Sequence, residues 1–226
     1  MIVSEISQTV TDTGKELSLP YLVREPKLVL TRKRAIILLH GVGSNEQDLF
    51  SLAERLPADS YVISPRGQFM LGTGRYAWYQ VDFSTGKPVI NPAQETSSRE
   101  LILTFIRQIK QQYKVNEVYI GGFSQGAIMS YGIALTHPDE VQGLIALSGR
   151  LLDEIEPFVF AGEKSYLKGL KVFIAHGVQD TVLPVYYARA AKEYLEKLAI
   201  PLTYHEYPTG HEISSLVLDD LNNWLK

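Results

Sequence analysis

The residue with the clearest chemical potential is Ser124, which lies in the sequence Gly-Phe-Ser-Gln-Gly at positions 122–126. This Gly-x-Ser-x-Gly spacing follows a strand-like stretch at 118–121 and precedes a helical stretch at 125–137. Glycines two residues before and after a serine leave room for a turn so tight that the serine takes strained backbone angles. Ser124 Oγ would then project above a sheet at the positive end of a helix, as a nucleophile does. The alternative is that Ser124 only caps the helix, because serine is a favoured N-cap residue.

A serine hydroxyl needs a general base to act as a nucleophile at neutral pH, and histidine is the usual one. His211 is the best candidate among five histidines, because it follows a predicted strand at 202–207 and lies downstream of Ser124. The alternative is that His211 is a plain helix-start residue. The other four have ordinary structural places, in a strand (His205), at a helix end before a proline (His137), and at strand ends followed by glycine (His40 and His176).

The carboxylate that orients the base is expected in the loop after the predicted strand at 171–175. Asp180 lies in this loop, directly before the strand that leads to His211. It could also be a turn aspartate that bonds the following backbone. Asp153, which comes after the predicted strand at 143–147, is the rival acid. We favour Asp180 because it follows the last-but-one predicted strand, while Asp153 occupies the loop one strand earlier.

Attack on a carbonyl builds negative charge on its oxygen, so the site also needs N–H donors that face this charge. One expected donor is the backbone N–H of Gln125, next to the candidate nucleophile. The other is the N–H of Val42, in the sequence His-Gly-Val-Gly at 40–43 after an aliphatic strand. The two glycines of this loop do not form a dinucleotide fingerprint, because Glu46 stands where the third glycine would be needed.

The elements that must position these residues alternate along the chain. Strands are predicted at 2–10, 17–24, 35–39, 61–64, 118–121, 143–147, 171–175 and 202–207, and helices at 46–56, 95–113, 125–137, 186–198 and 212–226. Apolar strands separated by amphipathic helices predict an α/β fold with a mostly parallel central sheet covered by helices on both faces. In such sheets the catalytic groups lie at the carboxyl ends of the strands, where every candidate above is placed.

The segment 66–92 has little periodicity and many aromatic residues and glycines. Loops of this length in a compact domain tend to be functional or to cover a site. We expect Leu71 and Trp78 to help wall a pocket for the acyl group of a substrate. The alternative is that these side chains only complete the core.

Length and composition exclude several classes of function. The 226 residues predict one domain over 1–226 with no separate lid domain, and 45% hydrophobic residues are typical of globular proteins. A net charge of −3 gives no basic field for nucleic acid, and the absence of cysteine excludes thiolate metal sites and cysteine nucleophiles. No aliphatic run is long enough to span a membrane and no export signal is visible, so we predict a cytoplasmic protein without integral membrane association. A homodimer is an open possibility.

Several motifs together resemble the phospholipase/carboxylesterase family of α/β-hydrolases, which includes acyl-protein thioesterases and small bacterial carboxylesterases. They are His-Gly-x-Gly at 40–43, Pro65-Arg66, Ala77-Trp78, Gly-Phe-Ser-Gln-Gly at 122–126, His-Gly-x-x-Asp at 176–180 with Pro184, and Gly-His-Glu-Ile-Ser at 210–214. The resemblance runs from about residue 35 to the C-terminus, and the Gly-Ser-Asn-Glu sequence at 43–46 looks nearer to the bacterial esterase branch.

The resemblance implies an α/β-hydrolase fold with Ser124 as nucleophile, Asp180 and His211 as its triad partners, and backbone donors at Val42 and Gln125. It implies a serine esterase that cleaves short to medium acyl esters, thioesters or lysophospholipids through an acyl-enzyme, with a small-molecule ester as partner and without a metal or organic cofactor. Two alternatives stay open. One is a catalytically silent scaffold that binds a small ligand. The other is a peptidase or lactone hydrolase that uses the same triad.

Overall fold

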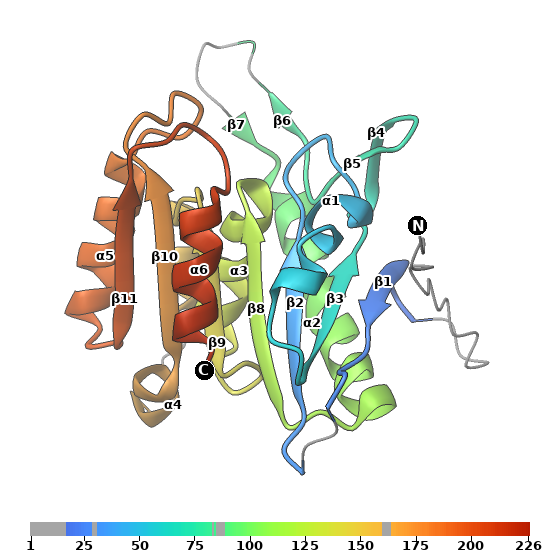
Figure 1. Cartoon of the computed structure of the whole chain (residues 1–226). Coiled ribbons are helices and arrows are strands. Elements are labelled where there is room, and N and C mark those ends of the chain that lie inside the picture. Colours follow the sequence, from blue (N-terminus) through green and yellow to red (C-terminus); the bar gives the residue numbers. More distant parts are fainter. Residues whose placement is uncertain (1–16, 29–30, 83, 85–88, 160–163) are drawn as a thin grey trace, which may run out of the picture.

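A central sheet of seven strands organises the molecule (Figure 1). The computed structural model describes residues 17–28, 31–82, 84, 89–159 and 164–226. The strand order is β1-β3-β2-β8-β9-β10-β11, in which β1 is antiparallel to β3 and all other neighbours are parallel. The strands are β1 (Tyr21–Arg24), β2 (Arg34–Leu39), β3 (Ser60–Pro65), β8 (Glu117–Phe123), β9 (Gly143–Leu147), β10 (Lys171–Gly177) and β11 (Leu202–Tyr207).

Helices cover both faces of this sheet, because successive side chains of each apolar strand point to opposite sides. Ile36 and Leu38 of β2 pack in one cluster with α1 (Glu46–Phe50) and α6 (Ser215–Trp224). Ala35, Ile37 and Leu39 pack in the other cluster, to which three long helices contribute buried residues. These helices are α2 (Pro92–Tyr113), α3 (Gln125–Thr136) and α5 (Tyr186–Lys197). In Figure 1, α6 lies in front of the sheet and α2 and α3 lie behind it.

Most predicted elements are present with small shifts of their ends. The helix expected at 46–56 is instead α1 followed by a short 3-10 helix, η1 (Ala53–Arg55). The strand expected at 17–24 is confirmed only for β1, and the strand expected at 2–10 lies outside the described residues. Outside the segment 66–92, two short elements were not predicted, the 3-10 helix η2 (Asp153–Phe158) and α4 (Lys164–Gly169).

The segment 66–92 forms two small hairpins rather than one irregular loop. The first pairs β4 (Phe69–Gly72) with β5 (Arg75–Ala77), and the second pairs β6 (Val81–Asp82) with β7 (Val89–Ile90). Both hairpins stand at the end of the sheet to which the arrows of β8 and β10 point (Figure 1). They therefore flank the edge where parallel sheets place their functional groups.

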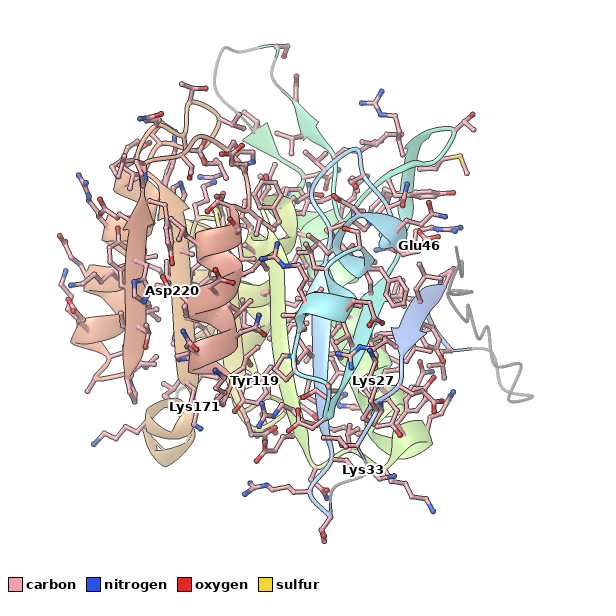
Figure 2. The ribbon with its side chains drawn as sticks, in the orientation of Figure 1. Lys27, Lys33, Glu46, Tyr119, Lys171 and Asp220 are labelled. Atoms are coloured by element: carbon pink, nitrogen blue, oxygen red, sulfur yellow. The ribbon has the colours of Figure 1, made fainter. Side chains whose placement is uncertain are left out.

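The two ends of the sheet differ in what they carry. Lys171, the first residue of β10, lies toward the amino ends of the strands, and Glu46, the first residue of α1, lies toward their carboxyl ends (Figure 2). Within the described part of the chain, no helix combines the length and the apolar character needed to cross a bilayer. Those same residues include no group of three or more side chains that could hold a metal ion together.

Candidate active site

Ser124 occupies a strained turn between β8 and α3. Its backbone angles are φ 55° and ψ −118°, which place a non-glycine residue at positive φ at a cost of about 1–3 kcal/mol. Its side chain makes no capping bond to α3, so the reading of Ser124 as an ordinary N-cap residue is wrong. The turn is held by the Ser124 N–H, which donates to the carbonyl of Leu147 at 3.0 Å.

The glycines on either side of Ser124 are required by close backbone packing. A Cβ on Gly126 would lie 1.8 Å from the Leu39 carbonyl oxygen, and a Cβ on Gly122 would lie 2.4 Å from the same atom. No side chain fits at these distances, so the motif lets α3 start directly against the end of β2. The amino end of α3, with its partial positive charge, is thereby brought beside Ser124.

The carboxylate of Asp180 contacts the imidazole of His211. Asp180 Oδ2 lies 2.7 Å from His211 Nδ1, and Oδ1 accepts from the N–H groups of Val182 and Leu183 at 2.9 and 2.8 Å. Asp180 is thus also the turn aspartate that the sequence offered as an alternative, since each oxygen serves a different partner. A proton on His211 Nδ1, facing the carboxylate, leaves Nε2 as an acceptor.

Asp153 does not take this place. It is the first residue of η2 and is exposed, and no contact with His211 is found for it in the described structure. The ring of His211 instead packs against Phe123, the residue before Ser124, with centroids 4.6 Å apart. The histidine and the candidate nucleophile therefore stand at neighbouring positions along the carboxyl edge of the sheet.

The loops that carry Asp180 and His211 are joined by backbone hydrogen bonds. The Val178 N–H donates to Tyr207 O at 2.8 Å, and the Gln179 N–H donates to Thr209 O at 3.0 Å. Gly177 allows this approach, because a Cβ there would lie 2.3 Å from the carbonyl oxygen of Thr209. These backbone hydrogen bonds hold the two loops together and so keep the side chains of Asp180 and His211 in contact.

His176 is a site residue that the sequence reasoning left in a structural role. Its buried side chain places Nε2 2.6 Å from the Leu183 carbonyl oxygen and 3.3 Å from Asp180 Oδ2. Its Nδ1 is buried and has no hydrogen-bond partner among the described residues. A proton on Nε2 satisfies the carbonyl and supports the carboxylate. The spacing of four residues between His176 and Asp180 was the only signal for this contact.

The two expected oxyanion donors lie near Ser124. Val42 is 45% exposed in the loop after β2, and Gln125 is the first residue of α3, whose N–H has no partner within the helix. Neither N–H donates to another described residue. The loop itself is fixed, since the Gly43 N–H donates to Tyr76 O and the Tyr76 N–H donates to Ser44 O, both at 2.8 Å.

A buried hydrogen-bond network links these two donor segments. The Gln125 side chain accepts from the Trp78 N–H at 2.9 Å and donates to the Tyr79 carbonyl at 2.7 Å. The Trp78 indole N–H donates to the His40 carbonyl at 2.9 Å. His40 Nε2 accepts from the Gly67 N–H at 2.9 Å, so its proton lies on Nδ1 and is donated to the Gly41 carbonyl at 2.7 Å. Burial lowers the pKa of His40 and keeps its ring neutral.

An ion pair between Glu46 and Arg66 stabilises the end of the loop that follows β2. Arg66 Nε donates to Glu46 Oε2 at 2.7 Å, and a second guanidinium nitrogen contacts Oε1. This bond holds the pKa of Glu46 below its usual range. The Arg66 guanidinium also stacks over the Tyr76 ring, 4.9 Å from its centroid. The Gly-Ser-Asn-Glu sequence therefore ends on a residue that ties α1 to the segment after β3.

Two cavities open beside this network. One of about 100 Å³ is lined by Ser124 and Gln125 together with Val42, Tyr79, Val81, Ile90, Ile128, Arg150, Val182 and Leu183. A larger one of about 820 Å³ shares Val42, Val81 and Ile90 with it and is also lined by Leu71. Trp78 lines neither cavity. The expectation that Trp78 walls an acyl pocket is corrected, because its indole is held in the core and its neighbour Tyr79 faces the cavity instead.

The phospholipase/carboxylesterase family matches residues 27–226. The chain belongs to this family. An acyl-protein thioesterase 1 of Kluyveromyces lactis is 30% identical over 177 residues, which cover 73% of this chain and 77% of the relative. Another of Emericella nidulans is 25% identical over 227 residues and covers 89% and 94% of the two chains.

Several solved structures resemble the fold over almost the whole chain. Esterase PE8 is 26% identical with a TM-score of 0.76 and covers 93% of this chain and 98% of its own. The maize acyl-protein thioesterase 2, at 20% identity, supports the fold alone, with a TM-score of 0.77 over 92% of this chain and 97% of its own. The protein is therefore an α/β-hydrolase that acts on ester bonds, as members of the family do.

Proposed function

We propose that this protein is a serine esterase in which Ser124, His211 and Asp180 form the catalytic triad. The observation that carries the proposal is the 2.7 Å contact between Asp180 and His211, together with the strained turn that holds Ser124 at the start of α3. A carboxylate at Nδ1 leaves Nε2 of His211 to accept the proton of the serine hydroxyl. A scaffold that only binds a ligand has no use for this tautomer.

In the first half of the reaction, His211 takes the proton from Ser124 Oγ as the oxygen attacks the ester carbonyl. The negative charge that develops on the carbonyl oxygen is stabilised by the N–H groups of Val42 and Gln125 and by the positive end of α3. Asp180 stabilises the imidazolium that forms. His211 then gives its proton to the leaving alcohol or thiol, and the acyl group stays on Ser124.

In the second half, His211 takes a proton from a water molecule that attacks the acyl-enzyme. The same two N–H groups stabilise the second oxyanion, and His211 returns the proton to Ser124 as the acid leaves. No step of this mechanism requires a metal ion or an organic cofactor.

The cavity beside Ser124 favours a short acyl group. It measures about 100 Å³, and most of its lining is apolar. The neighbouring larger cavity, which includes Leu71, offers room for the leaving group. We therefore propose short acyl esters as the preferred substrates. Thioesters are a second class to test, because the Kluyveromyces lactis relative is an acyl-protein thioesterase.

The test is the substitution Ser124→Ala, assayed with naphthyl butyrate. Loss of the nucleophile should lower kcat about 10⁵-fold or more, because the histidine and carboxylate have nothing to activate. The fold should persist, since alanine is no larger than serine at this backbone position. Ser130→Ala is the matched control, a buried serine of α3 whose hydroxyl bonds the Gly126 carbonyl. Its kcat should stay within a few-fold of wild type. Near-normal turnover by a folded Ser124→Ala variant contradicts the proposal.

A further inference from the structure

Arg150 lies at the cavity that contains Ser124, and the proposed mechanism gives it no task. Of the described residues that line this cavity, Arg150 alone carries a charge. The others are apolar, aromatic or neutral polar side chains. Binding of a neutral ester does not require a positive charge beside the acyl site, so this cation points to a role in substrate specificity.

The backbone at Arg150 is held firmly in place. Ser148 takes a positive φ of 49°, and its N–H donates to the Ala175 carbonyl at 2.9 Å. Gly149 packs so tightly on α3 that a Cβ there would lie 2.5 Å from the Cβ of Ala127. The guanidinium of Arg150 lies over the Tyr187 ring, 5.4 Å from its centroid. The charge is therefore positioned at the carboxyl end of β9, the strand next to the one that leads to Ser124.

Arg150 also has no carboxylate partner among the described residues, unlike Arg66 and Arg99. Arg66 pairs with Glu46, and Arg99 pairs with Glu95 at 3.1 Å. No described carboxylate lies within 4.0 Å of Arg150, although its side chain is partly buried. A guanidinium presents a planar fork of donors that matches a carboxylate in two parallel hydrogen bonds. The partner that completes this fork can come from the substrate.

We propose that the site selects esters that carry a carboxylate close to the scissile bond, and that Arg150 binds this carboxylate. This inference rests on the proposed serine esterase function, because it concerns the substrate of the same site. A single guanidinium without a second cation around the cavity matches a singly charged group better than a phosphate dianion. The half-ester of a dicarboxylic acid has the required chemistry, with an ester at one end and a carboxylate at the other.

The experiment compares anionic and neutral esters of matched size. In the first pair, naphthyl hydrogen glutarate carries a carboxylate on the acyl side, and naphthyl pentanoate is its neutral counterpart. In the second pair, acetoxybenzoate carries a carboxylate on the alcohol side, and phenyl acetate is its neutral counterpart. For each pair the readout is the ratio of kcat/KM for the anionic ester to kcat/KM for the neutral one. Wild type is compared with Arg150→Gln, Arg150→Lys and the control Lys171→Gln. The control removes one exposed cation at the opposite end of the sheet, which pairs with no carboxylate among the described residues (Figure 2).

Arg150→Gln should lower this ratio about 10-fold to 100-fold for at least one pair, the range expected when a charge-assisted hydrogen bond is lost. Arg150→Lys should retain part of the ratio, and Lys171→Gln should retain all of it. Raised salt should lower the wild-type ratio. The affected pair tells whether the carboxylate lies on the acyl or the alcohol side.

An unchanged ratio in Arg150→Gln for both pairs overturns the inference. This result is expected if Arg150 only stabilises the structure through its contact with Tyr187, because loss of that contact changes kcat/KM for both esters of a pair by the same factor. The serine esterase proposal survives that outcome as long as hydrolysis of the neutral esters depends on Ser124. If wild type hydrolyses none of these esters, or if Ser124→Ala matches wild type, the proposed function itself fails and the inference falls with it.

Discussion

At the scale of single residues, Asp180 is the side chain on which most contacts of the site converge. One oxygen accepts two backbone N–H groups, while the other meets His211 at 2.7 Å and His176 at 3.3 Å. The carboxylate is buried, so its lone pairs must be used by protein partners. This arrangement fixes both the position and the tautomer of His211.

The substitution Asp180→Asn tests that role. The amide oxygen of asparagine is expected to replace Oδ1 toward Val182 and Leu183, because both of these backbone groups are donors. The amide NH₂ then faces His211 Nδ1 and donates to it, which leaves the proton of the neutral ring on Nε2. A histidine in this tautomer cannot accept from Ser124, so kcat should fall about 10⁴-fold.

The rival acid supplies the control for this measurement. Asp153→Asn changes an exposed carboxylate in η2 to the same amide, and kcat should stay within about 2-fold of wild type. Steady-state kinetics on both variants, with far-UV circular dichroism to check folding, decides between the two acids. A large loss in Asp153→Asn combined with near-normal turnover in Asp180→Asn would reverse the assignment.

Residues such as these could be predicted from the sequence because each follows a recognisable strand. Ser124, Asp180 and His211 each come after one, and parallel strands place their carboxyl ends at one edge. Trp78 follows no predicted strand, and the position of His176 at a strand end did not indicate its contacts. Their roles depend on hydrogen bonds to Gln125, His40 and Leu183 that only the folded chain brings together.

At the scale of elements, the end of β2 is joined to the hairpin segment through His40. The neutral ring accepts from Gly67 and donates to Gly41, and its burial lowers its pKa. In the unfolded chain a histidine takes up a proton below about pH 6.5. The folded state resists this proton, so acid should favour unfolding.

The lowered pKa of His40 makes the free energy of unfolding depend on pH. The contribution of His40 is complete above about pH 6.5 and is lost as the pH falls from there through the lowered pKa of the folded state. The variant His40→Gln removes the titrating group. Urea unfolding at about pH 7.5 and about pH 5.5 should show a larger loss of stability in wild type than in the variant.

Other titratable groups with shifted pKa values do not account for a difference in pH dependence between wild type and His40→Gln. The pKa of His137 is also lowered by burial, and it contributes equally to both proteins. The pKa of Glu46 is lowered by Arg66, and its effect appears at more acidic pH. An equal loss of stability in wild type and His40→Gln would show that this ring does not stay neutral in the folded protein.

The elements themselves were predictable where apolar patterns are long. The predicted strands at 143–147 and 202–207 match β9 and β11, and the buried face of α2 was visible in its periodicity. The hairpins of the segment 66–92 could not be predicted from the sequence, because each of their strands has only two to four residues. Pairs this short are stabilised by contacts with neighbouring loops, such as Tyr76 with Ser44, rather than by local pattern.

At the scale of the whole molecule, one edge of the sheet carries the proposed chemistry. The carboxyl ends of β2, β8, β10 and β11 supply the oxyanion loop, the nucleophile, the acid and the base, and the two hairpins stand at the same end (Figure 1). The alternation of strands and helices was sufficient to predict this fold and this edge. The cavity and its single charge could not be predicted, because its walls come from five separate parts of the chain.

The central claim is that Ser124 carries the acyl group between the two half-reactions. Wild type and Ser124→Ala are mixed with naphthyl acetate, quenched in acid during turnover, digested and analysed by mass spectrometry. One acetyl group is expected on the wild-type peptide that contains Ser124, and none on any peptide of the variant. Full turnover with no acetyl group on Ser124, or an acetyl group on another residue that persists in Ser124→Ala, would contradict it.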